Sequence, residues 1–109
     1  MFRYLAKYRP MSEVFKALAD PTRRRVLQLL RERPMTAGEL AGHFSSSKAT
    51  LSAHFSVLRE AGLVAADKRG VTITYSLRLS VLEDALLAFA ETFGIGLAGA
   101  GALKEESGR

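Results

Sequence analysis

The chain has no cysteine and no tryptophan, and only two histidines, in 109 residues. Without cysteine it can form neither a disulfide scaffold nor a thiolate metal site. His43 and His54 leave little material for acid–base catalysis near neutral pH. No apolar run approaches the roughly 18 residues that would span a bilayer. These absences argue against an enzyme, a disulfide-rich scaffold and an integral membrane protein.

The length and the N-terminus indicate a single cytoplasmic domain. A chain this short is not expected to divide, because chains usually split into domains only beyond about 250 residues. The first ten residues, MFRYLAKYRP, are interrupted by Arg3, Lys7 and Arg9, so they lack the apolar core of a signal peptide. We therefore expect the protein in the cytoplasm.

The positive charge is concentrated in the front half of the chain. The net charge is +5 and the sequence pI is near 10.0, which favours a polyanion as partner. Residues 20–33 hold five arginines against two acidic residues, and residues 1–10 add three further basic residues. Residues 80–95 hold three acidic residues and no basic one. The alternative is that these charges only solvate the surface.

Local capping signals predict four helices before the apolar pattern changes from the period of a helix to that of a strand. Ser12 can cap a short first helix. Asp20 and Pro21 begin the second, because Asp accepts hydrogen bonds from the free amides of the first turn and Pro needs no N–H there. This second helix is expected to end near Arg33, since Pro34 follows it.

The third and fourth predicted helices are joined by a run of serines. Residues 36–39 (TAGE) form a capping box, which begins a short third helix that ends near Phe44. Serine is poor within helices and good at their N-caps, so a new helix is expected over residues 47–61, with Gly62 after its end. Two such helices are typical of a helix-turn-helix.

After residue 62 the apolar pattern changes to the period of a β-strand. The apolar residues that alternate with polar ones here are Val71, Ile73, Tyr75 and Leu77. We expect this half-buried strand to pair with residues 63–66, with the turn at 67–70. The resulting hairpin has a basic tip that carries Lys68 and Arg69.

Ser80 begins a last predicted helix that runs to about Phe93. Apolar residues cover more than half of its circumference, which is too wide for one packing partner inside so small a domain. A second copy of the chain is the simplest cover, and the alternative is that the short first helix covers it. Five of the nine glycines fall within residues 94–109, so we expect a flexible tail there.

The helix predicted over residues 47–61 has two distinct faces. Leu51, Phe55 and Leu58 fall on one side, and small or polar residues fall on the other. A solvated helix face usually carries long charged side chains, whereas small ones let a helix enter the major groove, which is about 12 Å wide. Small residues would also let another protein helix approach, but we favour insertion into the groove.

Side chains suited to DNA binding lie on this helix and on the hairpin. Hydroxyl groups in the first turn lie where free amides and the helix dipole attract phosphate. Lys48 can contact a guanine edge or a phosphate, and Ser52 can donate to or accept from a base. Lys68 and Arg69 could enter the adjacent minor groove or bind its phosphates.

Of Arg23–Arg25 at most two can face DNA, because successive helical residues lie about 100° apart, and one is a candidate for a structural ion pair.

Three segments resemble the ArsR-type winged helix-turn-helix repressors. They are ALADPTRRRVLQLL (17–30), SSSKATLSAHFSVLREAGLV (45–64) and the KRG…TYSL hairpin. The run S-x-H-F-x-x-L-R-E-A-G-L-V is fairly specific for that family, and the match covers residues 11–93 as one DNA-binding domain. The resemblance implies a mainly α (α+β) fold of helices with one β-hairpin wing. It places the recognition helix at 47–61 and the wing at 63–78.

The resemblance also implies a homodimer, joined through the first and last helices, that binds double-stranded DNA. The expected interface residues are Val14, Phe15, Leu82, Leu86, Phe89 and Phe93. By position, the groove-facing residues are Ser47, Lys48, Ala49, Ser52 and Ala53, with His54 near the DNA backbone. With the candidates above, the full predicted DNA-binding set is Ser46, Ser47, Lys48, Ala49, Thr50, Ser52, Ala53, His54, Ser56, Lys68 and Arg69.

Metal-sensing members of this family use cysteines in the helix before the serine run, or sets of Asp, His and Glu on the final helix. This chain has no cysteine, and Glu83, Asp84 and Glu91 alone make a poor transition-metal site. His43 and His54 fit helix packing or phosphate contact better than metal binding. We therefore expect no metal and no cofactor, and the chain resembles the metal-free, SdpR-like autorepressor branch.

The leading hypothesis is a sequence-specific DNA-binding repressor, by resemblance an autorepressor, that acts as a homodimer on an inverted repeat. The alternative is a winged-helix module that binds other proteins and has no DNA-binding duty. An enzyme has almost no support, because no phosphate-binding loop, activated nucleophile or convergent carboxylate pair is present. The sequence carries no signature of an effector. Residues 1–10 form a basic extension that could precede a true start at Met11, pack on the dimer or touch DNA.

Overall fold

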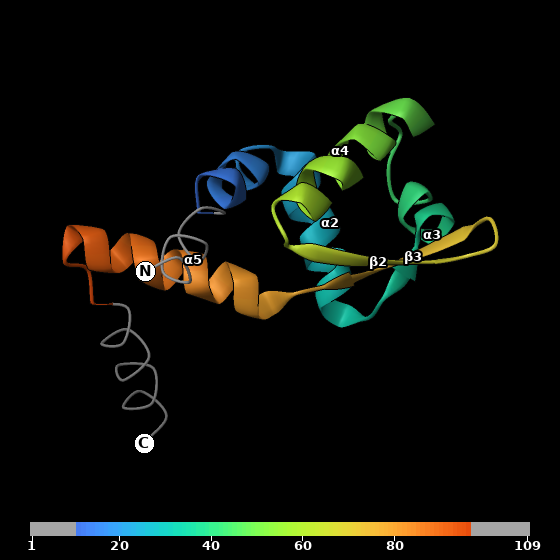
Figure 1. The fold of residues 1–109 in the computed structure, drawn as a ribbon. Coiled ribbons are helices and arrows are strands. Elements are labelled where there is room, and N and C mark those ends of the chain that lie inside the picture. Colours follow the sequence, from blue (N-terminus) through green and yellow to red (C-terminus); the bar gives the residue numbers. More distant parts are fainter. Residues whose placement is uncertain (1–10, 97–109) are drawn as a thin grey trace, which may run out of the picture.

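The computed structural model describes residues 11–96 (Figure 1). Residues 11–18 are helical, and the elements that follow are α2 (Pro21–Glu32), β1 (Met35–Thr36), α3 (Ala37–Ala41), α4 (Lys48–Glu60), β2 (Val64–Arg69), β3 (Thr72–Leu77) and α5 (Leu79–Phe93). The order of helices and the single hairpin agree with the predicted winged helix-turn-helix. The basic extension expected over residues 1–10, and the tail from residue 97 onward, lie outside the described residues.

The predicted caps set where α2 and α3 begin. Asp20 accepts a hydrogen bond from the backbone N–H of Arg23 at 3.1 Å, and Pro21 is the first residue of α2. Thr36 and Glu39 form the reciprocal capping box, with bonds of 3.0 and 2.9 Å between each side chain and the other's backbone N–H. These short-range hydrogen bonds satisfy amides that have no partner inside the helix, so local sequence determines both starts.

The helix α3 is shorter than predicted. It ends at Ala41 with Gly42 as its C-cap, rather than near Phe44. The chain still coils through the next two residues, where the N–H groups of His43 and Phe44 donate to carbonyls three positions earlier. Those bonds make a tight turn in place of a further α-helical turn.

The sheet has three antiparallel strands in the order β1-β3-β2, one more strand than predicted. The additional strand, β1, pairs Met35 with Tyr75 and Thr36 with Thr74. Two residues are too few to show a strand period in the sequence, which explains why β1 was missed. Its pairing gives β3 a hydrogen-bonded neighbour on both sides and fixes the hairpin to the start of α3.

The turn predicted at 67–70 is wrong by two residues. Pairing continues to Arg69 and Thr72, so only Gly70 and Val71 form the turn. Gly70 has φ +61° and Val71 has a negative φ, which fits a type II′ hairpin turn with glycine at its first central position. Val71 is 99% exposed, although its place in the alternation predicted a buried face, because the hairpin tip extends beyond the core.

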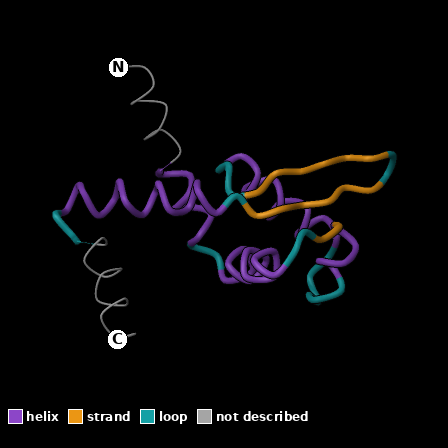
Figure 2. Tube along the Cα trace, turned by 90° about the horizontal axis from the view of Figure 1, so that it is seen from below, coloured by secondary structure: helices purple, strands orange, loops and turns teal. Residues whose placement is uncertain are grey.

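A single core joins all the helices to the sheet. Its largest fully buried side chains are Leu40, Leu58, Leu63, Val14 and Val26. The hairpin and α5 extend from this core toward opposite ends of the molecule (Figure 2). Within residues 11–96, no helix has both the length and the apolar character needed to cross a membrane.

Candidate nucleic-acid interface

The start of α4 is fixed by hydrogen bonds between Ser47 and Thr50. Ser47 Oγ accepts the backbone N–H of Thr50 at 3.1 Å and donates to Thr50 Oγ1 at 2.9 Å. Both residues, and Ser46 before them, remain exposed. Because these two hydroxyls bind each other, a phosphate at this end would meet mainly the remaining free backbone amides of the first turn.

The two faces predicted for α4 are present. Leu51, Phe55 and Leu58 are buried in the core, which fixes the rotation of the helix about its axis. The predicted outward residues are all exposed, namely Lys48, Ala49, Ser52, Ala53 and Ser56. The helix therefore presents to solvent one long cationic side chain at its start, small side chains through Ser56, and the long charged side chains of Arg59 and Glu60 in its last turn.

His54 lies between these two faces and binds α2. The guanidinium of Arg23 donates to His54 Nδ1 at 3.1 Å, and His54 Nε2 lies 3.8 Å from the Asp20 carboxylate. Because a guanidinium cannot accept, Nδ1 must be the acceptor, which leaves the ring proton on Nε2, facing Asp20. Only 17% of the His54 side chain is exposed, so the structure places it in a contact between helices.

Two of the three consecutive arginines of α2 bind backbone carbonyls. Arg23 donates to the carbonyls of Ala17 and Lys16 at 2.8 and 2.9 Å, and Arg24 donates to that of Leu18 at 2.7 Å. These carbonyls belong to the last turn of the helix over residues 11–18, where they lack α-helical partners, although the Lys16 carbonyl also accepts the N–H of Ala19 at 3.2 Å. Arg23 and Arg24 thus cap a helix, and within residues 11–96 none of the three arginines forms the structural ion pair considered from the sequence.

Capping also perturbs two carboxyl groups. The pKa of Asp20 is lowered from 3.8, chiefly because its carboxylate accepts the Arg23 backbone N–H. The pKa of Glu39 is lowered from 4.5, first by the backbone N–H of Thr36 and next by the Arg33 guanidinium, which lies 3.2 Å away. Both groups therefore favour the charged form in the folded chain.

The contacts that join Asp20, Arg23 and His54 were not predicted from the sequence. Asp20 was expected only as a cap, and His54 only near packing or phosphate. Arg23 and His54 are 31 residues apart, so no local spacing links them. The run of arginines is the one sequence signal at this position, and it suggested DNA contacts as readily as internal ones.

The wing carries its charged residues at the exposed end of β2. Lys68 and Arg69 are exposed, as the hairpin tip predicted, but they belong to the strand and not to the turn. Arg69 Nε lies 3.1 Å from the carboxylate of Asp67, which therefore offsets part of its charge. Both partners are largely exposed, so water weakens this ion pair and leaves it easily exchanged for another anion.

The apolar surface of α5 is continuous with the helix over residues 11–18. The ring of Phe89 packs at a tilt against that of Phe15, with centroids 5.0 Å apart, and against that of Phe93 at 4.8 Å. Phe93 is 66% exposed, and Leu86 and Phe89 are also exposed. The first helix thus contacts the stripe but leaves much of it uncovered.

The remaining predicted interface residues lie deeper. Val14 is 0% exposed and belongs to the core, so it has no surface left for a second chain. Leu82 is partly buried against the same core. His43 is exposed in the turn after α3, and in the described part of the chain no three His, Asp or Glu side chains gather closely enough to hold a metal ion.

Comparisons with known proteins agree on one family. A model described as a helix-turn-helix domain matches residues 18–65. The transcriptional repressor SdpR of Bacillus subtilis is 45% identical over 76 residues, which are 70% of this chain and 84% of that protein. A solved ArsR family transcriptional regulator has a TM-score of 0.73 at 30% identity, covering 79% of this chain and 89% of the other. The crystal structure of Rv0081 from Mycobacterium tuberculosis has a TM-score of 0.61 at 36% identity, covering 92% of this chain and 95% of the other. These matches confirm the resemblance seen in the sequence, and the chain belongs to the ArsR family of winged helix-turn-helix transcriptional regulators.

Proposed function

We propose that this regulator is a repressor that binds a specific site on double-stranded DNA as a homodimer. The main support is the outward face of α4, where Ala49, Ser52, Ala53 and Ser56 are exposed along a helix whose other face is fixed in the core. Small side chains let the helix backbone approach the base edges in the major groove. It acts by occupying DNA, without a cofactor and without catalysing a reaction, and we place it in the cytoplasm.

In this proposal each part of the surface has a distinct task. Lys48 and Ser52 contact base edges, and the free amides at the start of α4 bind a phosphate. Lys68 and Arg69 bind phosphates beside the adjacent minor groove, so they add affinity for any sequence. His54 contributes by holding α4 against α2 through Arg23, since its side chain is mostly buried there.

The homodimer would form through the exposed apolar residues of α5 with the first helix. Phe15, Leu86, Phe89 and Phe93 provide a contiguous surface that a second copy can cover. Two copies of α4 would then enter successive major grooves about 34 Å apart, on an inverted repeat. A dimer bound over a promoter would exclude the transcription machinery. If the chain is an autorepressor, one such repeat lies upstream of its own coding region.

Selection from random DNA, followed by titration of the selected duplex, tests this proposal. We expect one enriched inverted repeat, a dimer in sedimentation, and affinity that falls by about 10³-fold or more between about 50 and 200 mM salt. Lys48→Ala should cost about 1–3 kcal/mol on the selected site, whereas Arg69→Ala should weaken all sequences alike. Arg31→Ala, at the far end of α2, is the matched control.

The exposed apolar surface of α5 also favours a second candidate, a module that binds a different protein. That function predicts a monomer in isolation and no enriched DNA sequence. Enrichment of a repeat bound by a dimer would exclude it, whereas a monomer without sequence preference would exclude the repressor.

A further inference from the structure

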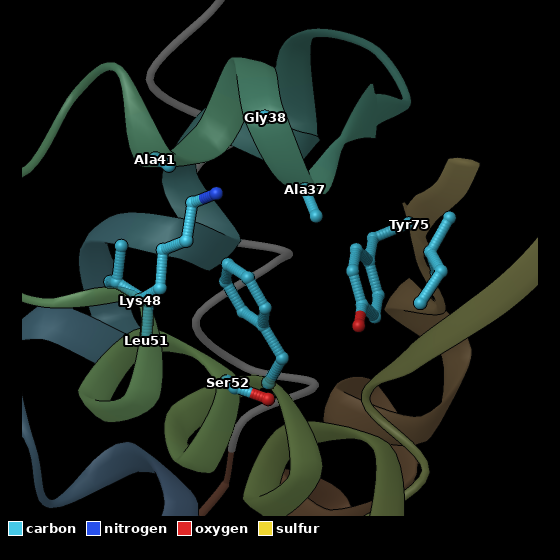
Figure 3. A pocket seen from close by; sticks show the side chains of 9 residues that line it. Ala37, Gly38, Ala41, Lys48, Leu51, Ser52 and Tyr75 are labelled. Carbon is cyan, nitrogen blue, oxygen red and sulfur yellow. The ribbon is translucent and has the colours of Figure 1, made fainter. Parts of the chain in front are cut away.

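A pocket of about 350 Å³ opens where α3, α4 and β3 meet (Figure 3). Small-molecule sites in proteins usually enclose about 300–1,000 Å³, so the space suffices for a compact ligand. The pocket exists because α3 contributes only small residues to it, namely Ala37, Gly38 and Ala41. The opposite wall is formed by larger apolar side chains of α4, Leu51 and Phe55, with Ile73 of β3.

The aromatic wall contains an unused hydroxyl. Tyr75 is only 7% exposed and stacks on Phe55 with ring centroids 4.9 Å apart. Its hydroxyl forms no hydrogen bond with another described residue. Every fully buried polar side-chain atom of the described chain has a hydrogen-bond partner, so this hydroxyl must retain some exposure to solvent. The Tyr75 hydroxyl therefore keeps contact with solvent, while the ring forms part of the pocket wall.

The mouth of the pocket is cationic. Lys48 lines it from the first turn of α4, and Figure 3 shows its amine end turned toward α3. Lys48 forms no ion pair within residues 11–96, so its charge is unopposed. The positive end of the α4 dipole adds to the same field, and the hydroxyl of Ser52 lies at the rim.

We propose that this pocket binds a small aromatic carboxylic acid. The apolar ring would lie between the small residues of α3 and the Phe55–Tyr75 pair, with its carboxylate at Lys48. The apolar walls favour an aromatic ring in the ligand, and the unopposed ammonium group at the mouth favours a carboxylate. A neutral ligand of the same shape would leave that ammonium without an anion.

Because of the position of the pocket, a ligand bound there would weaken the binding of DNA to the protein. Lys48 and Ser52 line the pocket and also belong to the proposed base-contacting surface. A bound carboxylate neutralises Lys48 and adds negative charge where phosphates would approach. Coupling between two ligands is reciprocal, so DNA must weaken the acid as much as the acid weakens DNA. This regulatory step rests on the proposed function, whereas occupation of the pocket does not.

A calorimetric titration of the full chain with 1-naphthoate, in the absence of DNA, tests whether the pocket binds this ligand. We expect saturable one-site binding, weaker by about two- to fivefold for the uncharged 1-naphthamide. Lys48→Gln should reduce the preference for naphthoate over naphthamide, and Gly38→Leu should abolish binding of both by filling the pocket. A Cβ at Gly38 meets no atom closer than 3.9 Å, so this variant should fold. Ser12→Leu, which adds the same side chain elsewhere, should bind as the wild type does.

Failure of naphthoate to bind, or equal binding by Gly38→Leu, would overturn the site. Tyr75→Phe offers a second variant of nearly unchanged volume that keeps the aromatic wall. Because the proposed carboxylate lies at Lys48, this variant should bind naphthoate as the wild type does, and loss of binding would contradict the proposed pose. The regulatory step is tested by adding naphthoate to the protein on its selected duplex. The apparent DNA Kd should rise several-fold for the wild type and stay constant for Gly38→Leu. A ligand that binds without changing the DNA Kd would refute antagonism alone, and absence of any DNA binding would refute the proposed function alone.

Discussion

Arg23 connects three helices through one guanidinium group. It donates to the carbonyls of Lys16 and Ala17, at the end of the first helix, and to the ring of His54 on α4. The planar fork of arginine can reach all three acceptors at once, which the single ammonium of lysine cannot. The angle at which α4 leaves the core thus depends on a residue of α2 outside the predicted DNA-binding set.

Arg23→Lys should therefore destabilise the fold more than Arg25→Lys does. We expect a loss of about 1–3 kcal/mol in the free energy of unfolding, because acceptors that Arg23 satisfies would lose their partners. Arg25 is exposed, and its one side-chain hydrogen bond to a described residue goes to Gln28 at 3.4 Å, which makes it the matched control. Urea unfolding measures both variants, and equal stabilities would contradict this role for Arg23.

The lowered pKa values of Asp20 and Glu39 predict acid sensitivity. A carboxyl group whose pKa falls on folding stabilises the fold above its unfolded value, here 3.8 and 4.5, and that contribution is lost as pH drops through the lower folded value. Asp20→Asn with Glu39→Gln retains capping side chains but removes the titration. The urea midpoint of this double variant should fall less between about pH 7 and pH 3 than that of the wild type. Parallel curves would show that neither group contributes.

Among the elements, the wing depends on one backbone angle. Gly70 adopts φ +61°, and a Cβ built there meets nothing within 4 Å. Gly70→Ala should thus cost only the backbone penalty, about 1–2 kcal/mol. Thermal unfolding measures this loss against Val71→Ala, which changes a 99% exposed residue at a negative φ. Equal stabilities of the two variants would contradict the turn assignment.

Most features set by short-range contacts were predictable from the sequence, although Ser12 and Ser80, which were expected to begin their helices, lie inside them. The caps at Asp20, Thr36 and Ser47, and the two faces of α4, each follow from residues within one or two turns. The features that were missed depend on distant partners. The strand β1 exists only because β3 lies beside it, and the true turn follows from pairing that continues to Arg69. Two further features arise only when separate elements pack together, namely the hydrogen bond between Arg23 and His54 and the pocket beside Tyr75.

For the whole molecule, the arrangement separates two surfaces. The hairpin extends toward one end and α5 toward the other, with α4 between them (Figure 1). An apolar surface at one end and a small, polar, basic one elsewhere allow a dimer to form without covering α4. The same separation lets each surface be changed by mutation independently of the other.

Phe93→Glu should convert the proposed dimer into a monomer. Phe93 is 66% exposed, so the substitution should leave the core intact while placing a charge inside the proposed interface. We expect the dimer dissociation constant to rise by about a hundredfold or more, which sedimentation velocity at micromolar concentration would detect. Val71→Glu changes a 99% exposed residue at the wing tip and should leave the dimer unchanged. A stable Phe93→Glu dimer would remove α5 from the interface.

The most direct test of DNA recognition by α4 is an anisotropy titration of the selected duplex with Ser52→Glu. Ser52 and Ser12 are both exposed helical residues, so Ser12→Glu is the matched control for added charge. If α4 enters the groove, a carboxylate at position 52 meets base edges and phosphates, and specific affinity should fall by about a hundredfold or more, while Ser12→Glu stays close to the wild type. Wild-type affinity in Ser52→Glu, with an unchanged salt dependence, would contradict recognition through this helix.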